Sequence, residues 1–420
     1  MKLTINTSLF CIVFLLIQCY SFSQNSNLTP AQKLIASGED SLNRGANLNK
    51  TVISGYGDAF YQRNFNQHES FATLDRAVLF VGHQFNDKFS VFTELEVEHA
   101  IVTGTNSDDH SSGEGDVAME QAFVKFNFNS HQYLIAGLFT PRIGITNENH
   151  LPVNFNGVER PLVEQMIIPT TWREIGVGFY GSSERLPLNY SIALINGLNS
   201  ANFQHDTGIG EGEGLGSDAS ANNLAVTASL QFHVSDFKFQ VAGYGGGTVA
   251  LNPRGSDSLG LNSGAFGTPL YLGEADMQFS KNGIGIKMLG IYIGYPDAGK
   301  LNEAYAKNTP SGMYGAYAEL GFDWLYKKKA AEQFITFARC EMLDMNAGIP
   351  SNGIYDGTQK QTHIIVGINY LPVPNIAIKA DVRLLHTGPQ NPDLVINPAP
   401  NGVPYKQNNQ FLNIGIGYSF

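Results

Sequence analysis

The sequence predicts an all-β fold, a transmembrane antiparallel β-barrel of about sixteen strands with short periplasmic turns and long outer loops. Three observations indicate this fold. The chain begins with an export signal, its strand candidates are joined alternately by short and long connections, and it ends on a fully alternating strand.

Residues 1–23 have the features of a secretory signal peptide. A short basic start precedes the apolar run from Leu9 to Ile17, and small residues then flank a cleavage point that leaves Gln24 as the mature start. Cys19 also admits a lipoprotein signal, although the residue before it is not small as that motif requires. Removal of the signal leaves Cys340 as the remaining cysteine, so we expect no intramolecular disulfide.

Residues 24–50 are expected to form a periplasmic lead-in to a barrel that spans residues 51–420. Thr29 and Pro30 are suited to begin a helix, because threonine caps an amino terminus and proline fits the first helical turn. A short helix and a flexible segment are both compatible with this stretch.

Strand candidates follow one another from there to the end of the chain. Most are about nine to fourteen residues long, which suits tilted strands that cross a hydrocarbon layer. They lie at residues 51–62, 74–85, 88–100, 118–128, 131–139, 172–181, 188–196, 222–233, 236–247, 269–279, 282–294, 312–326, 332–343, 360–371, 374–386 and 409–420.

The connections between these strands alternate in length. Hairpin-sized turns are expected at residues 86–87, 129–130, 234–235, 280–281 and 372–373. Long polar segments lie between them, at residues 101–117, 140–171, 197–221, 248–268, 295–311, 344–359 and 387–408. A membrane barrel has this pattern because one side carries plain turns and the other carries loops. The same pattern places both termini in the periplasm.

The last strand shows the period of two most clearly. Its apolar residues Leu412, Ile414, Ile416, Tyr418 and Phe420 alternate with the small or polar residues Asn413, Gly415, Gly417 and Ser419. A closed barrel ends on such a strand, because its last strand pairs with its first and leaves no open edge.

Alternation also assigns charged residues to the inside of the barrel. Glu94, Glu96 and Glu98 share one face of their strand, and Lys379 and Arg383 share the inner face of another. Lysine or arginine on the lipid face would cost about 2–4 kcal/mol at the membrane midplane, so these residues are expected to face a wet lumen. The three carboxylates repel one another, and inward Arg or Lys residues are expected to offset them.

The longest connection, residues 140–171, is the third outer loop. Loops of this length are usually functional or disordered. By analogy with porins of this strand number, we expect this one to fold into the barrel and narrow it; the alternative is a loop that lies outside. Its mixed charges would set a transverse field across the lumen. The predicted pore-lining residues are Arg142, Glu159, Arg160, Arg173, Glu94, Glu96, Glu98, Lys379 and Arg383.

Composition limits the function classes further. The formal net charge of −11 argues against nucleic acid as a partner. The mature chain has no apolar run near the roughly 18 residues of a spanning helix. The ten histidines show no metal-ligand pair at helical spacing and no nucleophile motif appears, so we expect no catalytic residues, no cofactor and no metal.

Several segments resemble one porin family. Ala136 to Ile145 is similar to the Gly-x-Phe-x-x-Pro-Phe-Gly motif of phosphate-selective porins O and P, and Trp172 to Val177 resembles the segment that re-enters the barrel in that family. Tyr190 to Asn199 and Phe337 to Glu341 are similar to later strands. The chain departs from the family at Arg142 and the residue after it, and it lacks a dense Arg and Lys run. Its signal is similar to those of Bacteroidetes.

The sequence as a whole predicts a porin of the bacterial outer membrane for passive diffusion of small hydrophilic solutes or ions. The family resemblance implies an anion or phosphate type. A homotrimer is expected by analogy with general porins. The alternatives are a non-conducting barrel that acts as an adhesin and a barrel enzyme.

Overall fold

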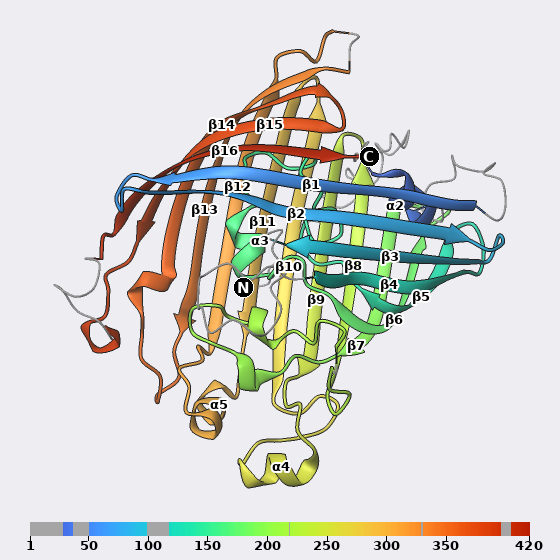
Figure 1. The fold of residues 1–420 in the computed structure, drawn as a ribbon. Helices are drawn as coiled ribbons and strands as arrows, with labels where there is room; N and C mark the ends of the chain where they lie inside the picture. The colour runs from blue at the N-terminus through green and yellow to red at the C-terminus, as the bar shows by residue number, and fades with distance from the viewer. Residues whose placement is uncertain (1–27, 37–49, 99–116, 218, 329–330, 396–404) are drawn as a thin grey trace, which may run out of the picture.

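The structure, a computed structural model, is a closed barrel of sixteen antiparallel strands (Figure 1). It describes residues 28–36, 50–98, 117–217, 219–328, 331–395 and 405–420. The predicted signal peptide, residues 1–23, lies outside the described residues. So does the predicted long connection at residues 101–117, apart from its last residue.

Each strand is paired with its neighbours in the sequence, and β1 also pairs with β16. The strands are β1 (Lys50–Asn64), β2 (Glu69–Gln84), β3 (Phe89–Glu98), β4 (Val117–Asn127), β5 (Gln132–Phe139), β6 (Glu174–Ser182), β7 (Leu188–Asn196), β8 (Leu224–Val234), β9 (Phe237–Gly247), β10 (Pro269–Lys281), β11 (Ile284–Gly294), β12 (Gly312–Asp323), β13 (Gln333–Gly348), β14 (Lys360–Val373), β15 (Ile376–Thr387) and β16 (Asn408–Ser419). All sixteen predicted strands are confirmed.

Two connections differ from the prediction. β1 and β2 stay paired as far as Asn64 and Glu69, so the first connection of the loop-bearing side is a tight turn and the alternation of short and long connections fails there. β13 extends to Gly348, five residues beyond the predicted end, and shortens the loop that follows it. Below, the end of the barrel with the long connections is called the loop end, and the opposite end, where β1 begins and β16 finishes, is called the turn end.

Closure of the barrel rests on the alternating carboxyl-terminal strand. β16 pairs with β1 from Tyr56 opposite Ser419 to Asn64 opposite Phe411. This pairing removes the open edges that would otherwise leave backbone N–H and C=O groups without partners in lipid. The predicted pairing of the last strand with the first is therefore confirmed.

The two faces of the wall differ in the way that the alternation predicts. On β3, Leu95 is 39% exposed and faces outward, whereas Glu94 and Glu96 face inward and are buried. On β15, Ile378 and Val382 are exposed, whereas Lys379 is buried. Apolar side chains thus cover the outside of the barrel, and most charged side chains of the strands lie inside. In the described ranges, no helix has the length and apolar character needed to cross a membrane.

A short helix, α2 (Pro30–Ala36), lies at the turn end and contacts β1, β2 and β3. Thr29 caps it: its hydroxyl accepts from the backbone N–H of Gln32, whose side-chain oxygen accepts from Thr29. This reciprocal pair is a capping box. The backbone N–H of Ala31 donates to Ser54 on the inner face of β1, which fixes the helix against the wall.

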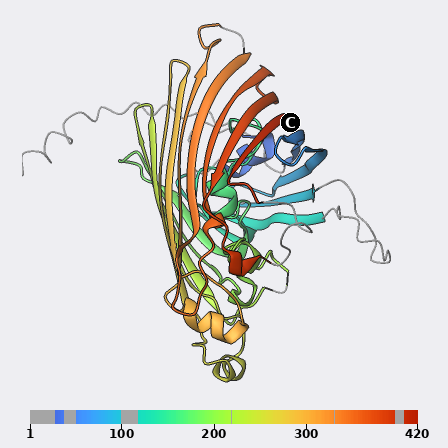
Figure 2. The ribbon, with the colours of Figure 1, turned by 90° about the vertical axis from the view of Figure 1, so that its left-hand side faces the viewer.

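Among the described residues, three further α-helices lie in the long connections: α3 (Leu162–Met166), α4 (Pro253–Ser258) and α5 (Ala298–Tyr305). Single 3-10 turns accompany them at η2 (Ser200–Asn202), η3 (Gly210–Gly212), η4 (Gly357–Gln359) and η5 (Pro392–Leu394). α4 and α5 lie at the loop end of the barrel (Figure 1), whereas α3 lies between the walls (Figure 2).

Candidate functional site

The third loop, residues 140–173, folds into the barrel. It begins after β5 and ends where β6 starts at Glu174, and its helix α3 contacts the inner faces of β12 and β13. The loop carries its own apolar core of fully buried side chains: Ile143, Leu151, Val163, Ile167, Ile168 and Trp172. Of the two placements left open by the sequence, the structure has the folded-in one.

Glu164 holds the fold of the loop together. Its carboxylate accepts hydrogen bonds from the backbone N–H groups of Ile145 and Thr146 at 2.9 and 2.6 Å and from the Thr146 hydroxyl at 2.8 Å. Its other oxygen accepts from the Tyr317 hydroxyl on β12 at 2.7 Å. Four donors on one buried carboxylate make it a strong link between the loop and the wall.

The middle of the loop is bound to the wall of β12 to β16. Arg339 on β13 donates to the backbone oxygens of Asn156 and Glu159, and it forms ion pairs with Glu319 and Glu341. On β15, Lys379 donates to the carbonyl of Phe155 at 2.9 Å and Asp381 accepts from the N–H of Val158 at 2.7 Å. The inner-wall charges therefore bind the backbone of the loop.

Small residues on β16 let the loop approach closely. A Cβ atom added to Gly417 would lie 2.4 Å from Cβ of Pro152, and one added to Gly415 would lie 3.0 Å from Val158. The gap that remains between the loop and this wall has a volume of about 10 Å³. The alternating glycines of the last strand thus serve the contact with the loop as well as the strand pattern.

A larger cavity lies on the loop-end side of this contact, inside β1, β2, β15 and β16. Its volume is about 340 Å³, and it is lined by Gln62, Asn64, Gln67, Glu69, Phe71, Leu385, Asn409 and Phe411. Arg383 stacks on the ring of Phe411, 4.3 Å from its centroid, and pairs with Glu159 of the third loop at 3.4 Å. The side chains of Arg383 and Glu159 are 12% and 24% exposed. Burial raises the pKa of Glu159 above its ordinary value, although the charge of Arg383 opposes this.

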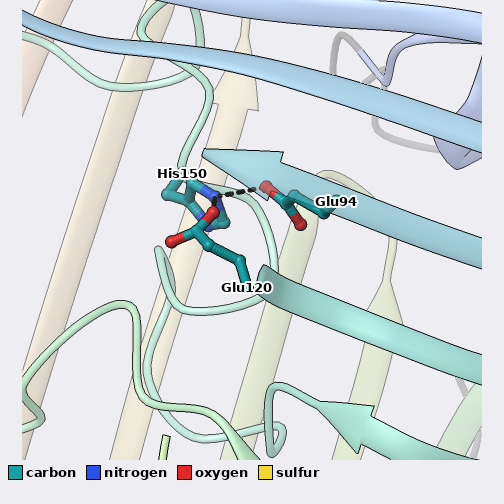
Figure 3. Close-up of side chains that lie close together, drawn as sticks. All are labelled: Glu94, Glu120 and His150. Atoms are coloured by element: carbon teal, nitrogen blue, oxygen red, sulfur yellow. Dashed lines mark hydrogen bonds and ion pairs between the residues drawn. The ribbon is translucent and has the colours of Figure 1, made fainter. Parts of the chain in front are cut away.

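A second group of charges lies where the loop meets β3 and β4. We call Glu94, Glu96, Glu120 and His150 the His150 cluster; all four are almost completely buried. Nε2 of His150 is 3.3 Å from Oε1 of Glu94 and 3.5 Å from Oε2 of Glu120 (Figure 3). Burial opposes the charge on His150, but hydrogen bonds to Glu120 and Glu94 outweigh it and raise the pKa of His150 to about 9.

Glu120 reaches this cluster through a β-bulge. Glu94 pairs with Gln121 and Leu95 pairs with Met119, so Glu120 is the extra residue on β4. Bulges re-aim side chains and occur next to functional sites. Simple alternation along β4 would not reveal this position, and the sequence analysis did not select Glu120.

Six of the nine predicted pore-lining residues fall into two separate groups. Glu159, Arg383 and Lys379 lie together at the β15 wall. Glu94 and Glu96 lie at the β3 wall, where Arg173 is 3.6 Å from Glu120.

The remaining predicted residues lie around these groups. Arg142 pairs with Glu148 of the same loop at 2.8 Å and stacks on Tyr180. Arg160 is buried, and Glu98 ends β3 opposite Arg76.

The neutralisation of the glutamates differs from the expectation in one respect. Arg76 does lie beside Glu96, but it pairs with Asp58 on the neighbouring strand β1 and with Asp75, the residue before it on β2. Lys379 and Arg383 bind the third loop instead. Ion pairs to Glu94 and Glu120 come instead from His150 and Arg173, which both belong to the third loop.

A further loop, residues 197–217 and 219–223, also covers the lumen, which was not predicted from the sequence. Leu198, Phe203 and Ile209 are fully buried. The carbonyl of His205 accepts from Asn346 of β13. These three residues are large and apolar in an otherwise polar loop, and this pattern in the sequence indicates burial.

Sequence comparisons find one relative of this chain among the curated proteins. No family model matches the chain. An uncharacterized protein of Aquifex aeolicus strain VF5 is 28% identical over 342 residues, which cover 78% of this chain and 74% of that protein.

Solved outer-membrane proteins share the architecture at low sequence identity. OmpF of Salmonella typhi, in complex with daunomycin, aligns with a TM-score of 0.53 and 12% identity over 89% of this chain and 98% of that one. A loop L8 deletion mutant of OmpT, an outer membrane protein of Vibrio cholerae, gives 0.51 and 9% over 89% and 100%. An anion-selective porin from Comamonas acidovorans gives 0.50 and 9% over 88% and 99%. The chain therefore has the fold of outer-membrane porins.

Proposed function

We propose that this protein is a porin of the bacterial outer membrane, with both termini in the periplasm, that lets small hydrophilic solutes or ions diffuse passively. The observation that carries the proposal is the third loop inside a closed sixteen-stranded barrel, with the Glu159–Arg383 pair beside a lumenal cavity. An apolar outside and a charged inside fit a water-filled passage through lipid.

The filter is narrow and of mixed charge. The loop is hydrogen-bonded or ion-paired to β3, β4, β9 and to β11 through β16, so it crosses the lumen and would narrow a passage there. Acidic and basic groups placed together set a transverse field that favours small dipolar solutes. We expect a small conductance and no catalysis or cofactor in this function.

The finer proposal, a phosphate-selective channel of the porin O and P type, has weaker support. Arg76 and Arg339 each lie between two carboxylates, which reduces the positive field that an anion would meet. The ammonium group of Lys379 donates to the backbone carbonyl of Phe155 in the loop, so it is also engaged within the protein. We therefore favour a weakly selective channel, and a homotrimer remains a prediction.

Single-channel recording of the refolded protein in a planar bilayer tests the proposal. We expect small stepwise ohmic openings and a reversal potential near zero under a salt gradient. A folded, heat-modifiable barrel that never conducts would overturn the porin function and favour an adhesive or enzymatic barrel. A strongly anion-selective reversal potential would instead support the phosphate type.

A further inference from the structure

We propose that Glu94, Glu120 and His150 form a binding site for a divalent transition-metal cation such as Zn²⁺, which joins the third loop to the β3–β4 wall. The proposal does not depend on whether the barrel conducts. It rests on the geometry of three buried side chains from two strands and one loop (Figure 3).

The tautomer of His150 is the first argument. Its Nδ1 lies 3.2 Å from the carbonyl oxygen of Asn147, and because a carbonyl only accepts, Nδ1 carries a proton. Nε2 then faces oxygens of Glu94 and Glu120. A neutral imidazole has a lone pair at Nε2, so this lone pair and the two oxygens need a proton or a metal ion between them. A backbone carbonyl on the other ring nitrogen is the usual support of a metal-bound histidine.

The distances are the second argument. The separations of 3.3 and 3.5 Å from Nε2 to the two carboxylate oxygens are long for charge-assisted hydrogen bonds, which are usually about 2.7–2.9 Å. Two ligand atoms that are each about 2.1 Å from a tetrahedral zinc ion lie about 3.4 Å apart. All three ligand atoms fall within 4.8 Å of one another, so they can converge on one ion.

A carboxylate oxygen and a hydroxyl without partners are the third argument. Within the described part of the chain, Oε1 of Glu96 and the hydroxyl of Tyr56 are buried and have no hydrogen-bond partner, and Oε2 of Glu120 is met by Nε2 of His150 at a long 3.5 Å. Tyr56 stands beside His150, with ring centroids 5.6 Å apart, and the carboxyl of Glu96 is a near neighbour of Glu120. Such groups cost free energy unless an ion or water satisfies them.

The other oxygen of each glutamate accepts a hydrogen bond, which orients the two carboxylates. Gln121 donates to Oε2 of Glu94 at 2.5 Å, and the Thr171 hydroxyl donates to Oε1 of Glu120. These contacts leave Oε1 of Glu94 and Oε2 of Glu120 to face His150. Glu120 takes this orientation because it is the bulged residue of β4.

The donor set selects the class of cation. Imidazole nitrogen with carboxylate oxygen suits Zn²⁺ and related transition metals, whereas Ca²⁺ and Mg²⁺ prefer oxygen alone. Three protein ligands leave a fourth position open, and Glu96 and Tyr56 are neighbours of the ligands. We assign the ion a positioning role, because its ligands link the loop to two strands.

The experiment is Zn²⁺ titration by calorimetry of the refolded full-length barrel after chelator treatment. Wild type should bind about one equivalent, and His150→Gln and Glu120→Gln should each bind at least tenfold more weakly. Glu274→Gln is the matched control, because Glu274 is a buried inner-wall glutamate beside Asp276, apart from this cluster and without a histidine ligand. It should bind like wild type. Heat-modifiable migration on a gel verifies that each variant is folded.

No saturable binding by wild type, or equal binding by His150→Gln, would overturn the proposal; the first result would mean that a proton alone occupies the cluster. Wild type loaded with Co²⁺ provides a test that does not depend on the folding of any variant. A strongly shifted imidazole N–H proton resonance is expected from the metal-bound histidine, and its absence would also overturn the site.

Discussion

Arg383 and Glu159 form an ion pair between the barrel wall and the third loop, with Nη1 of Arg383 3.4 Å from Oε2 of Glu159. Both side chains keep some contact with solvent, unlike the pairs that Arg339 makes with Glu319 and Glu341. In the proposed channel, an ion that passes the loop on this side can therefore approach both charges directly. They are therefore the best candidates for a charge filter.

Removal of the negative charge and removal of the positive charge should shift ion selectivity in opposite directions. Glu159→Gln should move the reversal potential under a KCl gradient toward anion preference, and Arg383→Gln should move it toward cation preference. Lys281→Gln is the control, because Lys281 pairs with Asp236 at the turn end and is 53% exposed. If neither filter variant differs from this control, the pair does not line the route of the ions.

Selectivity should also depend on pH through Glu159. Burial raises its pKa, and Asp381 and Asp75 raise it further against the opposing charges of Arg383 and Arg339. The carboxylate should therefore take up a proton above the ordinary glutamate pKa of about 4.3. As pH falls from neutrality, wild type should become more anion-selective, and Glu159→Gln should lack this part of the shift. The same pH response in both proteins would assign it to another group.

Replacement of Glu164 by alanine should release the third loop. The change leaves the N–H groups of Ile145 and Thr146 and the hydroxyl of Tyr317 without their buried acceptor. We expect a loss of about 3 kcal/mol or more in the free energy of unfolding in urea. Openings should become larger and noisier, and the loop should become open to protease.

Tyr317→Phe is the graded comparison for Glu164. It removes one of the four donors and keeps the ring, so the loss should be about 1 kcal/mol. Equal effects of the two variants would show that the Tyr317 contact, and not the backbone contacts within the loop, sets the position of the loop.

The wall could be predicted from sequence because a lipid-facing strand obeys one simple rule. Every second residue is apolar, and this rule located all sixteen strands and the inward placement of Glu94, Glu96 and Lys379. The folded-in third loop was expected by analogy with porins of this strand number. A bulge breaks the rule by one residue, so Glu120 could not be placed from alternation.

The partners of the inner charges could not be predicted for a different reason. His150 is thirty residues beyond Glu120 along the chain and meets it only because the loop turns back into the barrel. The contacts of Asp381 with the backbone of Val158 and of Lys379 with Phe155 have no signature in the sequence. Gly415 and Gly417 are visible as small residues, but their fit to the loop appears only in the structure.

Orientation in the membrane leads to a labelling prediction. Ser351 is exposed in a loop-end connection and Asp87 is exposed in a turn-end connection. With the native thiol removed by Cys340→Ser, we expect Ser351→Cys to react with a large membrane-impermeant maleimide on intact cells. Asp87→Cys should react only after the outer membrane is permeabilised, because periplasmic turns are closed to the reagent. If only Asp87→Cys were labelled on intact cells, the barrel would have the opposite orientation, with both termini outside the cell.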